Sequence, residues 1–222
     1  MPERAPLIAA PAPPTFDAEF QDRLESLFRW RRDVRRFRPD PLDPGALDDL
    51  IAQAALAPSV GNSQPWRFVK VAAADRRRDV RAIFERCNRQ ALGGYEGERA
   101  ALYARLKLAG LDAAPVQIAV FVDDGTQIGL GLGRKTMPET LSYSVVTAIH
   151  TLWLAARARG IGVGWLSILE PAEVRRILDV PETWSLVAYL CVGYPEEEHD
   201  DPELVRAGWQ DRVDLAKFVV ER

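Results

Sequence analysis

Cysteine and histidine are scarce in this chain of 222 residues, which has two of each. Cys87 and Cys191 form no Cys-x-x-Cys pair, and they do not combine with His150 and His199 at any recognised spacing of metal ligands. The pattern is therefore not that of a zinc site or a disulfide framework. We expect reduced thiols and no metal.

The chain also lacks a large excess of either charge and has no long hydrophobic run. The net charge of -3 at pH 7 gives no overall field that would attract nucleic acid or an anionic membrane. No apolar stretch reaches the roughly 18 residues of a membrane-spanning helix, and the start of the chain lacks the basic segment and apolar core of a signal peptide. These absences predict a cytoplasmic protein with neither nucleic acid nor a membrane as partner.

The composition is otherwise that of an ordinary globular protein, with 47% hydrophobic and 27% charged residues. The length suits one compact domain with a sizeable core, and no internal repeat or linker divides the chain. We therefore predict a disordered N-terminal tail over residues 1–15 and a single domain over residues 16–222.

Hydrophobic periodicity separates helices from strands. One helix is expected to begin with a cap at Asp43 and Pro44 and to stop at Pro58. The other predicted helices cover residues 16–32, 75–92, 98–108, 136–159 and 173–178, and the predicted strands cover residues 67–72, 116–122, 163–169 and 185–192. Strands and helices do not alternate strictly, which favours an α+β layer fold.

The helix predicted over residues 136–159 differs from the others. Thr136 and Glu139 fit a capping box at its start, and Gly160 terminates it. Apolar side chains cover most of its circumference, and a helix that is apolar all round is buried. We expect it at the centre of the fold or in a subunit interface.

Six arginines crowd residues 29–38, and one carboxylate, Asp33, sits among them. Guanidinium groups stay charged and offer planar forks of donors, so such a run can cradle a phosphate. The alternative is a solvated helix end whose cations favour the C-terminal dipole. An acid amid the cations suggests chemistry as well as binding.

A second polar segment covers residues 57–68. A helix stops at Pro58, a turn of small residues exposes Ser59, Asn62 and Gln64, and the chain then enters a strand through Pro65. Such a turn can donate and accept hydrogen bonds along the edge of a planar heterocycle. By itself, the segment is also explained as a tight turn.

Three glycines occupy five positions at 160–164, where a strand opens. Glycine weakens a strand, so this choice suggests that something flat lies close against the backbone. Ser167 shares the period-two register of Val163 and Trp165 and adds a hydroxyl to an apolar strand. A bulge and a satisfied core hydroxyl are the plainer explanations.

The glycine-rich segment 128–136 is not a nucleotide-binding motif. It is not Gly-x-Gly-x-x-Gly directly after a strand, and Arg134 breaks the spacing of a P-loop. As a hinge before a helix it suits a mobile lid over a ligand, and a plain surface loop suits it equally.

Several motifs occur in an order that matches a known family. They are Arg31-Arg32-x-Val34-Arg35, Ala57-Pro58-Ser59 with Asn62, Gln64-Pro65-Trp66, Gly162-Val163-Gly164-Trp165, Gly193-Tyr194-Pro195 and the late Arg212. Over nearly the whole chain they resemble the FMN-dependent nitroreductase family. Further motifs, such as Asp33, Gly131-Leu132-Gly133-Arg134, Ser167, Pro202-Glu203-Leu204 and Gly208-Trp209, are similar to its branch of 5,6-dimethylbenzimidazole synthases. Asp33 and Ser167 separate that branch from ordinary nitroreductases.

The resemblance implies a central, mostly antiparallel sheet surrounded by helices, in an intertwined homodimer with two FMN sites at the interface, each built from both chains. It implies an oxidoreductase in which reduced FMN is the substrate and O2 the co-substrate. The flavin is fragmented to 5,6-dimethylbenzimidazole, the lower ligand of vitamin B12, and erythrose 4-phosphate. A separate NAD(P)H-dependent flavin reductase would supply reduced FMN.

The resemblance also assigns roles to residues. Asp33 would be the catalytic base, which the surrounding arginines should keep ionised, and Ser167 would relay or orient a proton. The FMN-binding residues would be Arg31, Arg32, Asp33, Val34, Arg35, Pro58, Ser59, Asn62, Leu108, Gly162, Val163, Gly164 and Arg212. Arg31, Arg35 and Arg212 would hold the phosphate and ring oxygens.

Two other functions compete with this one. A conventional NAD(P)H-dependent nitroreductase or flavin reductase would use FMN as a reusable cofactor and would need room above it, whereas residues 96–136 resemble a cover. A flavin-storage module would have no need of Asp33.

Overall fold

The computed structural model describes residues 12–105 and 110–222. Most of the predicted tail, residues 1–11, lies outside the described residues. The elements are α1 (Ala18–Trp30), α2 (Ala46–Ala54), η1 (Val60–Asn62), β1 (Trp66–Lys70), α3 (Ala74–Leu92), α4 (Gly97–Arg105), α5 (Gly110–Ala113), β2 (Val116–Asp123), η2 (Ile128–Gly131), α6 (Thr140–Arg157), β3 (Gly162–Leu166), α7 (Pro171–Leu178), β4 (Trp184–Gly193), α8 (Glu203–Arg206) and η3 (Leu215–Lys217), where η marks a 3-10 helix. The α+β prediction is confirmed.

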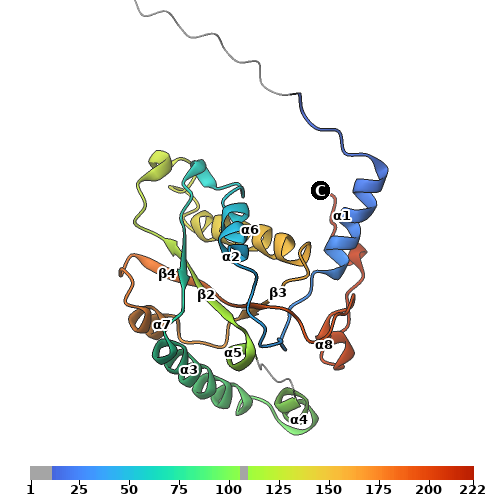
Figure 1. Ribbon diagram of the computed structural model, residues 1–222, viewed down its shortest axis with the longest axis vertical. Helices are drawn as coiled ribbons and strands as arrows, with labels where there is room; N and C mark the ends of the chain where they lie inside the picture. The colour runs from blue at the N-terminus through green and yellow to red at the C-terminus, as the bar shows by residue number, and fades with distance from the viewer. Residues whose placement is uncertain (1–11, 106–109) are drawn as a thin grey trace, which may run out of the picture.

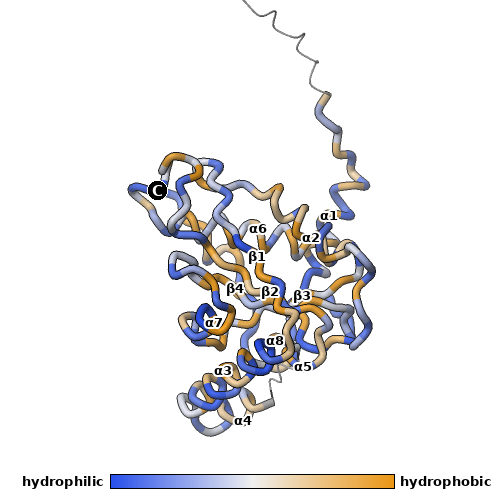
Figure 2. The backbone as a smooth tube through the Cα atoms, turned by 60° about the vertical axis from the view of Figure 1, so that its left-hand side comes forward, coloured by the Kyte–Doolittle hydropathy of each residue, from blue (hydrophilic) through white to orange (hydrophobic). Residues whose placement is uncertain are grey.

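The sheet has the strand order β1-β2-β4-β3, and every neighbouring pair is antiparallel. β2 and β4 lie in the middle, and the hydropathy colouring in Figure 2 shows apolar strands in the interior. Successive side chains of β2 point to opposite faces, as in any strand. β2 is buried on both, as its continuous apolar run predicts.

Helices cover both faces of the sheet (Figure 1). On one face, Ile118, Val120 and Val122 of β2 pack in a cluster with α2 and α6. On the other, Ala119 and Phe121 pack in a cluster with α3 and α7. The sheet is therefore the middle layer of three.

The predicted central helix is α6, and its buried position is confirmed. Its buried residues are Leu141, Ser144, Val145, Ala148, Ile149, Leu152, Trp153 and Ala156. The capping box is wrong, however, because the helix begins at Thr140 and its N-cap, Glu139, makes no side-chain cap bond. Thr140 instead bonds the Met137 carbonyl through both its N–H and its hydroxyl.

Other element ends also differ from the prediction, since α2 ends at Ala54 and not at Pro58. α2 begins at Ala46 after Gly45, whose φ of 81° is the left-handed conformation, and no side chain caps it. The Asp43 carbonyl accepts the Ala46 N–H, so the Asp43-Pro44 pair forms a turn before the helix. β3 ends at Leu166, and Ser167 therefore follows the strand instead of belonging to it.

α1 has no buried residue, although its sequence is amphipathic. Phe20 and Phe28 keep 43% and 47% of their surface exposed. Within the described ranges, we find no helix with the length and hydropathy needed to cross a membrane.

Candidate functional site

The residues that follow α1 run beside the free edge of β3. We call residues 31–37 the cationic segment. The Val34 N–H donates to the Val163 carbonyl over 3.1 Å, and Asp33 forms a parallel bridge with Val163. One carboxylate oxygen of Asp33, Oδ1, accepts the Trp165 N–H over 2.8 Å. The segment therefore takes up donors and acceptors that an edge strand would otherwise leave open.

The glycines of β3 are explained by this packing. A Cβ on Gly164 would lie 2.2 Å from the Val34 carbonyl oxygen, and one on Gly162 would lie 2.8 Å from a Val34 methyl. Contacts under 3.0 Å require the backbone or side chain to shift. The flat object predicted to lie against β3 is therefore the chain's own cationic segment.

Asp33 is held away from water although its side chain keeps 36% exposure toward a cavity. Removal from water raises its pKa, and the Trp165 hydrogen bond and the Arg35 guanidinium offset only part of the rise. Glu203 raises the pKa further. The arginines therefore lower the pKa of Asp33 by less than desolvation raises it.

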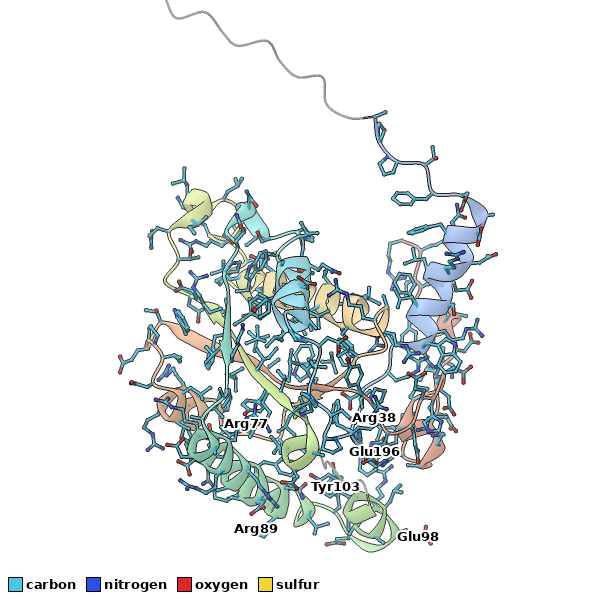
Figure 3. All side chains as sticks on the ribbon, in the orientation of Figure 1. Arg38, Arg77, Arg89, Glu98, Tyr103 and Glu196 are labelled. Atoms are coloured by element: carbon cyan, nitrogen blue, oxygen red, sulfur yellow. The ribbon has the colours of Figure 1, made fainter. Side chains whose placement is uncertain are left out.

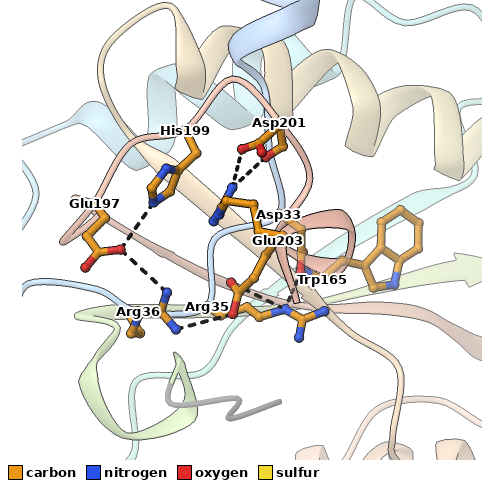
Figure 4. A network of polar contacts seen from close by, with 9 residues as sticks. Asp33, Arg35, Arg36, Trp165, Glu197, His199, Asp201 and Glu203 are labelled. Atoms are coloured by element: carbon orange, nitrogen blue, oxygen red, sulfur yellow. Dashed lines mark hydrogen bonds and ion pairs between the residues drawn. The ribbon is translucent and has the colours of Figure 1, made fainter. Parts of the chain in front are cut away.

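Arg35 lies between two carboxylates. Its Nε is 3.5 Å from Asp33 Oδ2 and 3.9 Å from Glu203 Oε2, and the side chain is 12% exposed. This buried Nε makes no hydrogen bond of acceptable geometry among the described residues. Figure 4 shows Glu203 of α8 reaching Arg35 and also Arg36, whose Nη1 is 3.3 Å from Glu203 Oε1. Arg35 thus has donor capacity left for a ligand.

A second group of guanidiniums lies beside the first. The Arg31 guanidinium stacks 4.7 Å from the Trp153 ring centre. Desolvation lowers the pKa of Arg31, and the charge of Arg212 lowers it further against the opposing effect of Asp33. Arg31 and Arg212 also lower the pKa of Arg32 after desolvation. The positive charges of Arg31, Arg32 and Arg212 repel one another, so binding of an anion among them is favourable.

Arg32 has fewer donors free than its neighbours. Its Nε and Nη2 bond the Asp200 carbonyl at 3.0 and 2.6 Å, and its Nη1 bonds the Arg31 carbonyl. These bonds fasten the loop after β4 to the cationic segment. Arg32 therefore has a structural part in addition to its charge.

Two cavities meet at the cationic segment. A charged cleft has Arg32, Asp33, Trp153 and Arg157 in its walls. A smaller apolar pocket on the other side is lined by Gly110, Leu111, Gly164, Trp165, Leu166 and Cys191. Asp33, Val34 and Arg35 line both. Asp33, a carboxyl with a raised pKa, thus lines both a charged and an apolar cavity.

The second predicted polar segment forms what we call the amide turn, residues 58–64. Ser59 Oγ accepts the Gln64 N–H over 3.0 Å. Asn62 has a φ of 54° and an exposed side chain. The Val60 N–H donates to Ser144 Oγ, which anchors the turn on α6.

The glycine-rich loop supports the amide turn. A Cβ on Gly61 would lie 2.8 Å from the Leu132 carbonyl oxygen, and one on Gly129 would lie 2.5 Å from the Gly61 carbonyl oxygen. A Cβ on Gly133 would lie 2.7 Å from a Val60 methyl. The loop is therefore packed backbone to backbone, and these glycines serve close approach.

The predicted site residues divide into two groups along α6. The cationic segment meets α6 at Trp153, whose Nε1 donates to the Arg32 carbonyl, and the amide turn meets it at Ser144. These positions are nine residues apart, about 14 Å along a helix. Ser167 is exposed and lines neither cavity, and Leu108 lies outside the described residues.

Sequence reasoning gave no role to Glu203 or Trp153. Glu203 stood only within the motif Pro202-Glu203-Leu204, about 170 residues from the arginines it contacts. Trp153 read as a core residue of the central helix. The motif Pro202-Glu203-Leu204 could have pointed to Glu203, because it contains a carboxylate to which the sequence analysis gave no role.

Comparison with known proteins supports the predicted family. The model of the nitroreductase family matches residues 28–194. A 5,6-dimethylbenzimidazole synthase of Rhodospirillum rubrum is 60% identical over 90% of this chain and 94% of its own. A 5,6-dimethylbenzimidazole synthase of Rhodobacter capsulatus is 49% identical over 89% of this chain and 96% of its own.

Solved structures agree on the fold. Iodotyrosine deiodinase, crystallised with FMN and 3-iodo-L-tyrosine, has a TM-score of 0.67 at 26% identity and covers 79% of this chain and 91% of its own. A nitroreductase-like protein from Streptococcus mutans has a TM-score of 0.68 at 18% identity over 91% of this chain and 98% of its own. The chain therefore belongs to the nitroreductase family.

Proposed function

We propose that this protein is a 5,6-dimethylbenzimidazole synthase, which fragments reduced FMN with O2 and releases 5,6-dimethylbenzimidazole and erythrose 4-phosphate. The observation that carries the proposal is the position of Asp33, a carboxyl with a raised pKa that lines both the charged cleft and the apolar pocket. The names of the two curated relatives support it.

The residues present fit FMN. The buried Arg35 Nε has no hydrogen-bond partner within residues 12–105 and 110–222, which suits an acceptor atom of the flavin ring. Arg31 and Arg212, with Arg32 beside them, suit the phosphate. Val34 and the β3 residues Gly162, Val163 and Gly164 would form the wall behind the ligand. Pro58, Ser59 and Asn62 of the amide turn would contact the ring, and Leu108 remains a predicted contact.

Reduced FMN supplies the electrons and O2 the oxidising power, and the protein supplies proton transfer and orientation. Asp33 would accept a proton at the ribityl carbon, and its raised pKa brings it closer to the pH at which a general base works well. Its Oδ1 is fixed by the Trp165 N–H, which leaves Oδ2 for the reaction. Ser167, exposed just beyond β3, would relay a proton to a ring nitrogen once the site closes.

The protein would act as a homodimer in which each FMN site uses the cationic segment of one chain and the amide turn of the other. The outer face of α6 carries Tyr143 and Val146, with 55% and 40% of their surface exposed. Phe20 and Phe28 of α1 and Phe218 near the C-terminus are also exposed. We infer that these exposed apolar residues form part of the interface between the two chains.

A separate NAD(P)H-dependent flavin reductase would deliver reduced FMN. The alternative function, an NAD(P)H-dependent nitroreductase with reusable FMN, needs an open face for the nicotinamide. The predicted cover over residues 96–136 is shorter than expected, because residues 116–123 are the central strand β2. The choice therefore depends on the reaction products.

The test is to mix the protein with FMN in air, with an unrelated flavin reductase and NADH to keep the flavin reduced. We expect 5,6-dimethylbenzimidazole to accumulate while flavin is consumed, as followed by chromatography with mass detection. Oxidation of NAD(P)H by the protein alone, with FMN left intact and no benzimidazole formed, would establish the nitroreductase instead.

A further inference from the structure

Glu203 is the second carboxylate on the guanidinium that faces Asp33. Its Oε2 lies 3.9 Å from Arg35 Nε, while Asp33 Oδ2 lies 3.5 Å from the same nitrogen. Glu203 is 20% exposed, so water screens these contacts only in part. One buried cation is therefore shared between two anions.

Arg36 competes with Arg35 for the carboxylate of Glu203, and this weakens the effect of Glu203 on the Arg35–Asp33 pair. The other oxygen of Glu203, Oε1, lies 3.3 Å from Arg36 Nη1, and Figure 4 shows Arg36 on the side of Glu203 away from Asp33. Arg36 in turn is 3.7 Å from the exposed Glu197. The carboxylate of Glu203 is thus held between two arginines.

We infer that Glu203 is a positioning residue, which acts through Arg35 to set how firmly that guanidinium pairs with Asp33. This inference rests on the proposed function, in which Asp33 is the base. With Glu203 in place, Arg35 is divided between two acids and Asp33 accepts a proton more readily. Without the charge of Glu203, Arg35 would pair fully with Asp33 and make it a weaker base.

The other groups around Asp33 do not replace Glu203. Among the described residues, the charged or titratable groups that act on Asp33 are Arg31 and Arg35 in its own segment, Glu203 of α8 and Cys191 of β4. Burial raises the pKa of the Cys191 thiol to about 12, so it stays neutral. β3 contributes the Trp165 N–H, which carries no net charge. Glu203 is therefore the second anion.

The loop that carries Glu203 is fastened by other contacts. Arg32 bonds the Asp200 carbonyl twice, and Arg206 bonds Asp201 Oδ1 over 2.5 Å. The Glu203→Gln substitution keeps these bonds and the shape of the side chain. Its amide oxygen can still accept a hydrogen bond from Arg36, so the variant removes mainly the charge.

The test is the pH profile of kcat/KM for reduced FMN in the full-length protein. Its acidic limb reports protonation of the base in the free enzyme. In Glu203→Gln the limb should move to lower pH, and kcat at neutral pH should fall by a factor of about 2 to 10, since a weaker base keeps part of its effect. Asp40→Asn, whose carboxylate pairs with the exposed Arg38 and not with Arg35 or Arg36, is the control and should leave the limb in place.

A second variant has the opposite expected sign. Arg36→Gln leaves Glu203 with Arg35 alone, which draws Arg35 from Asp33 and should move the limb to higher pH. A purely structural role for Glu203 would lower the amount of folded protein without moving the limb. Unmoved limbs in both variants, or movement in the same direction, would overturn the inference.

A direct titration separates this inference from the proposed function. Protein with 13C-labelled aspartate and no FMN is titrated by NMR, and the Asp33 carboxyl is identified as the signal missing from Asp33→Asn. Its midpoint should be lower in Glu203→Gln than in wild type, and an equal midpoint would overturn the inference. If wild type makes no benzimidazole, the proposed function fails, while this titration still decides the link between Glu203 and Asp33.

Discussion

The cationic segment and the amide turn are both packed closely against glycines, but they differ in charge. The cationic segment lies against β3 and carries charge, with Arg35 divided between Asp33 and Glu203 and with the charge of Arg212 lowering the pKa of Arg31. The amide turn has no ionisable side chain, and close backbone contacts with the glycine-rich loop fix it. The first can therefore bind an anion and move protons, whereas the second can offer only shape and neutral hydrogen bonds.

Both regions rest on α6, at Trp153 and Ser144. A rigid helix keeps the distance between them constant, so neither region can adjust to the other. If the two regions of one chain serve different flavins, the helix sets the spacing between the two sites of a dimer. Substitutions in each region can test whether proton transfer and anion binding depend on the cationic segment alone.

The largest expected effect is loss of product in Asp33→Asn. We expect synthesis of 5,6-dimethylbenzimidazole to fall by at least about 100-fold, since the base is removed. Reduced FMN should still bind, because the amide oxygen can accept the Trp165 N–H in place of Oδ1. Product yield and a flavin titration measure the two outcomes, and a yield near that of wild type would remove Asp33 from the mechanism.

The same variant has an expected effect on stability. The pKa of Asp33 is raised in the folded protein, so its contribution to stability is present below the unfolded-state pKa and is lost as pH rises through the folded-state value. Asparagine has no such pH dependence. Between pH 6 and 8, roughly the usual stability range of proteins, thermal unfolding of Asp33→Asn should occur at or above the wild-type temperature, and a clear decrease would contradict the desolvation of Asp33.

The next effect is on assembly. Val146 lies on the outer face of α6 and is 40% exposed, so Val146→Asp should leave the chain folded but place an unpaired charge in the proposed interface. We expect a monomer by light scattering, with a normal circular dichroism spectrum and weakened FMN binding. Ile149→Asp is the contrasting variant, since Ile149 is 0% exposed and a charge there should unfold the chain itself. A Val146→Asp dimer that binds FMN normally would rule out this face.

A smaller effect is expected at the phosphate. Arg212→Ala should raise the dissociation constant of reduced FMN by roughly 10- to 100-fold, the equivalent of about 1.5 to 3 kcal/mol for a charge-assisted contact. Arg89→Ala is the control, because Arg89 lies in the last turn of α3 (Figure 3) and lines neither cavity. Equal titrations for the two variants would show that Arg212 is a surface charge.

A last effect, on stability instead of activity, concerns the amide turn. Gly61 and Gly45 both have positive φ, at 56° and 81°, but a Cβ meets the Leu132 carbonyl only at Gly61. Gly45→Ala should therefore cost about 1 to 2 kcal/mol for the backbone conformation, and Gly61→Ala should cost about 1 to 3 kcal/mol more for the clash. Chemical denaturation measures both, and equal losses would show that the turn is not held by the loop.

The sequence predicted the fold class and most elements because hydrophobic periodicity is local. Val116–Asp123 was recognised as a buried strand from its own residues. The helix starts were less predictable, since Thr140 and Ala46 begin their helices after turns that look like caps in sequence. Several residues before each helix could serve as its start, and the geometry of the preceding turn determines which one does.

The sequence identified most residues of the candidate site, but it did not show how burial and neighbouring charges change the pKa of Asp33. The motifs named Asp33 and the arginines, but the net effect of burial and charge on Asp33 depends on packing against β3. Gly162 and Gly164 suggested a flat neighbour, and only the structure identifies it as Val34. Glu203 could not be placed because its contacts with Arg35 and Arg36 join distant parts of the chain.

The most direct test of the account is complementation between two inactive variants, Asp33→Asn and the double variant Ser59→Ala/Asn62→Ala. If each site takes the cationic segment from one chain and the amide turn from the other, a mixed dimer has one site with both regions intact. Unfolding and refolding an equal mixture should then give about a quarter of the wild-type product yield, since half of the dimers are mixed and each has one intact site. A mixture as inactive as the separate variants, or a fully active double variant, would contradict the division of the site between two chains.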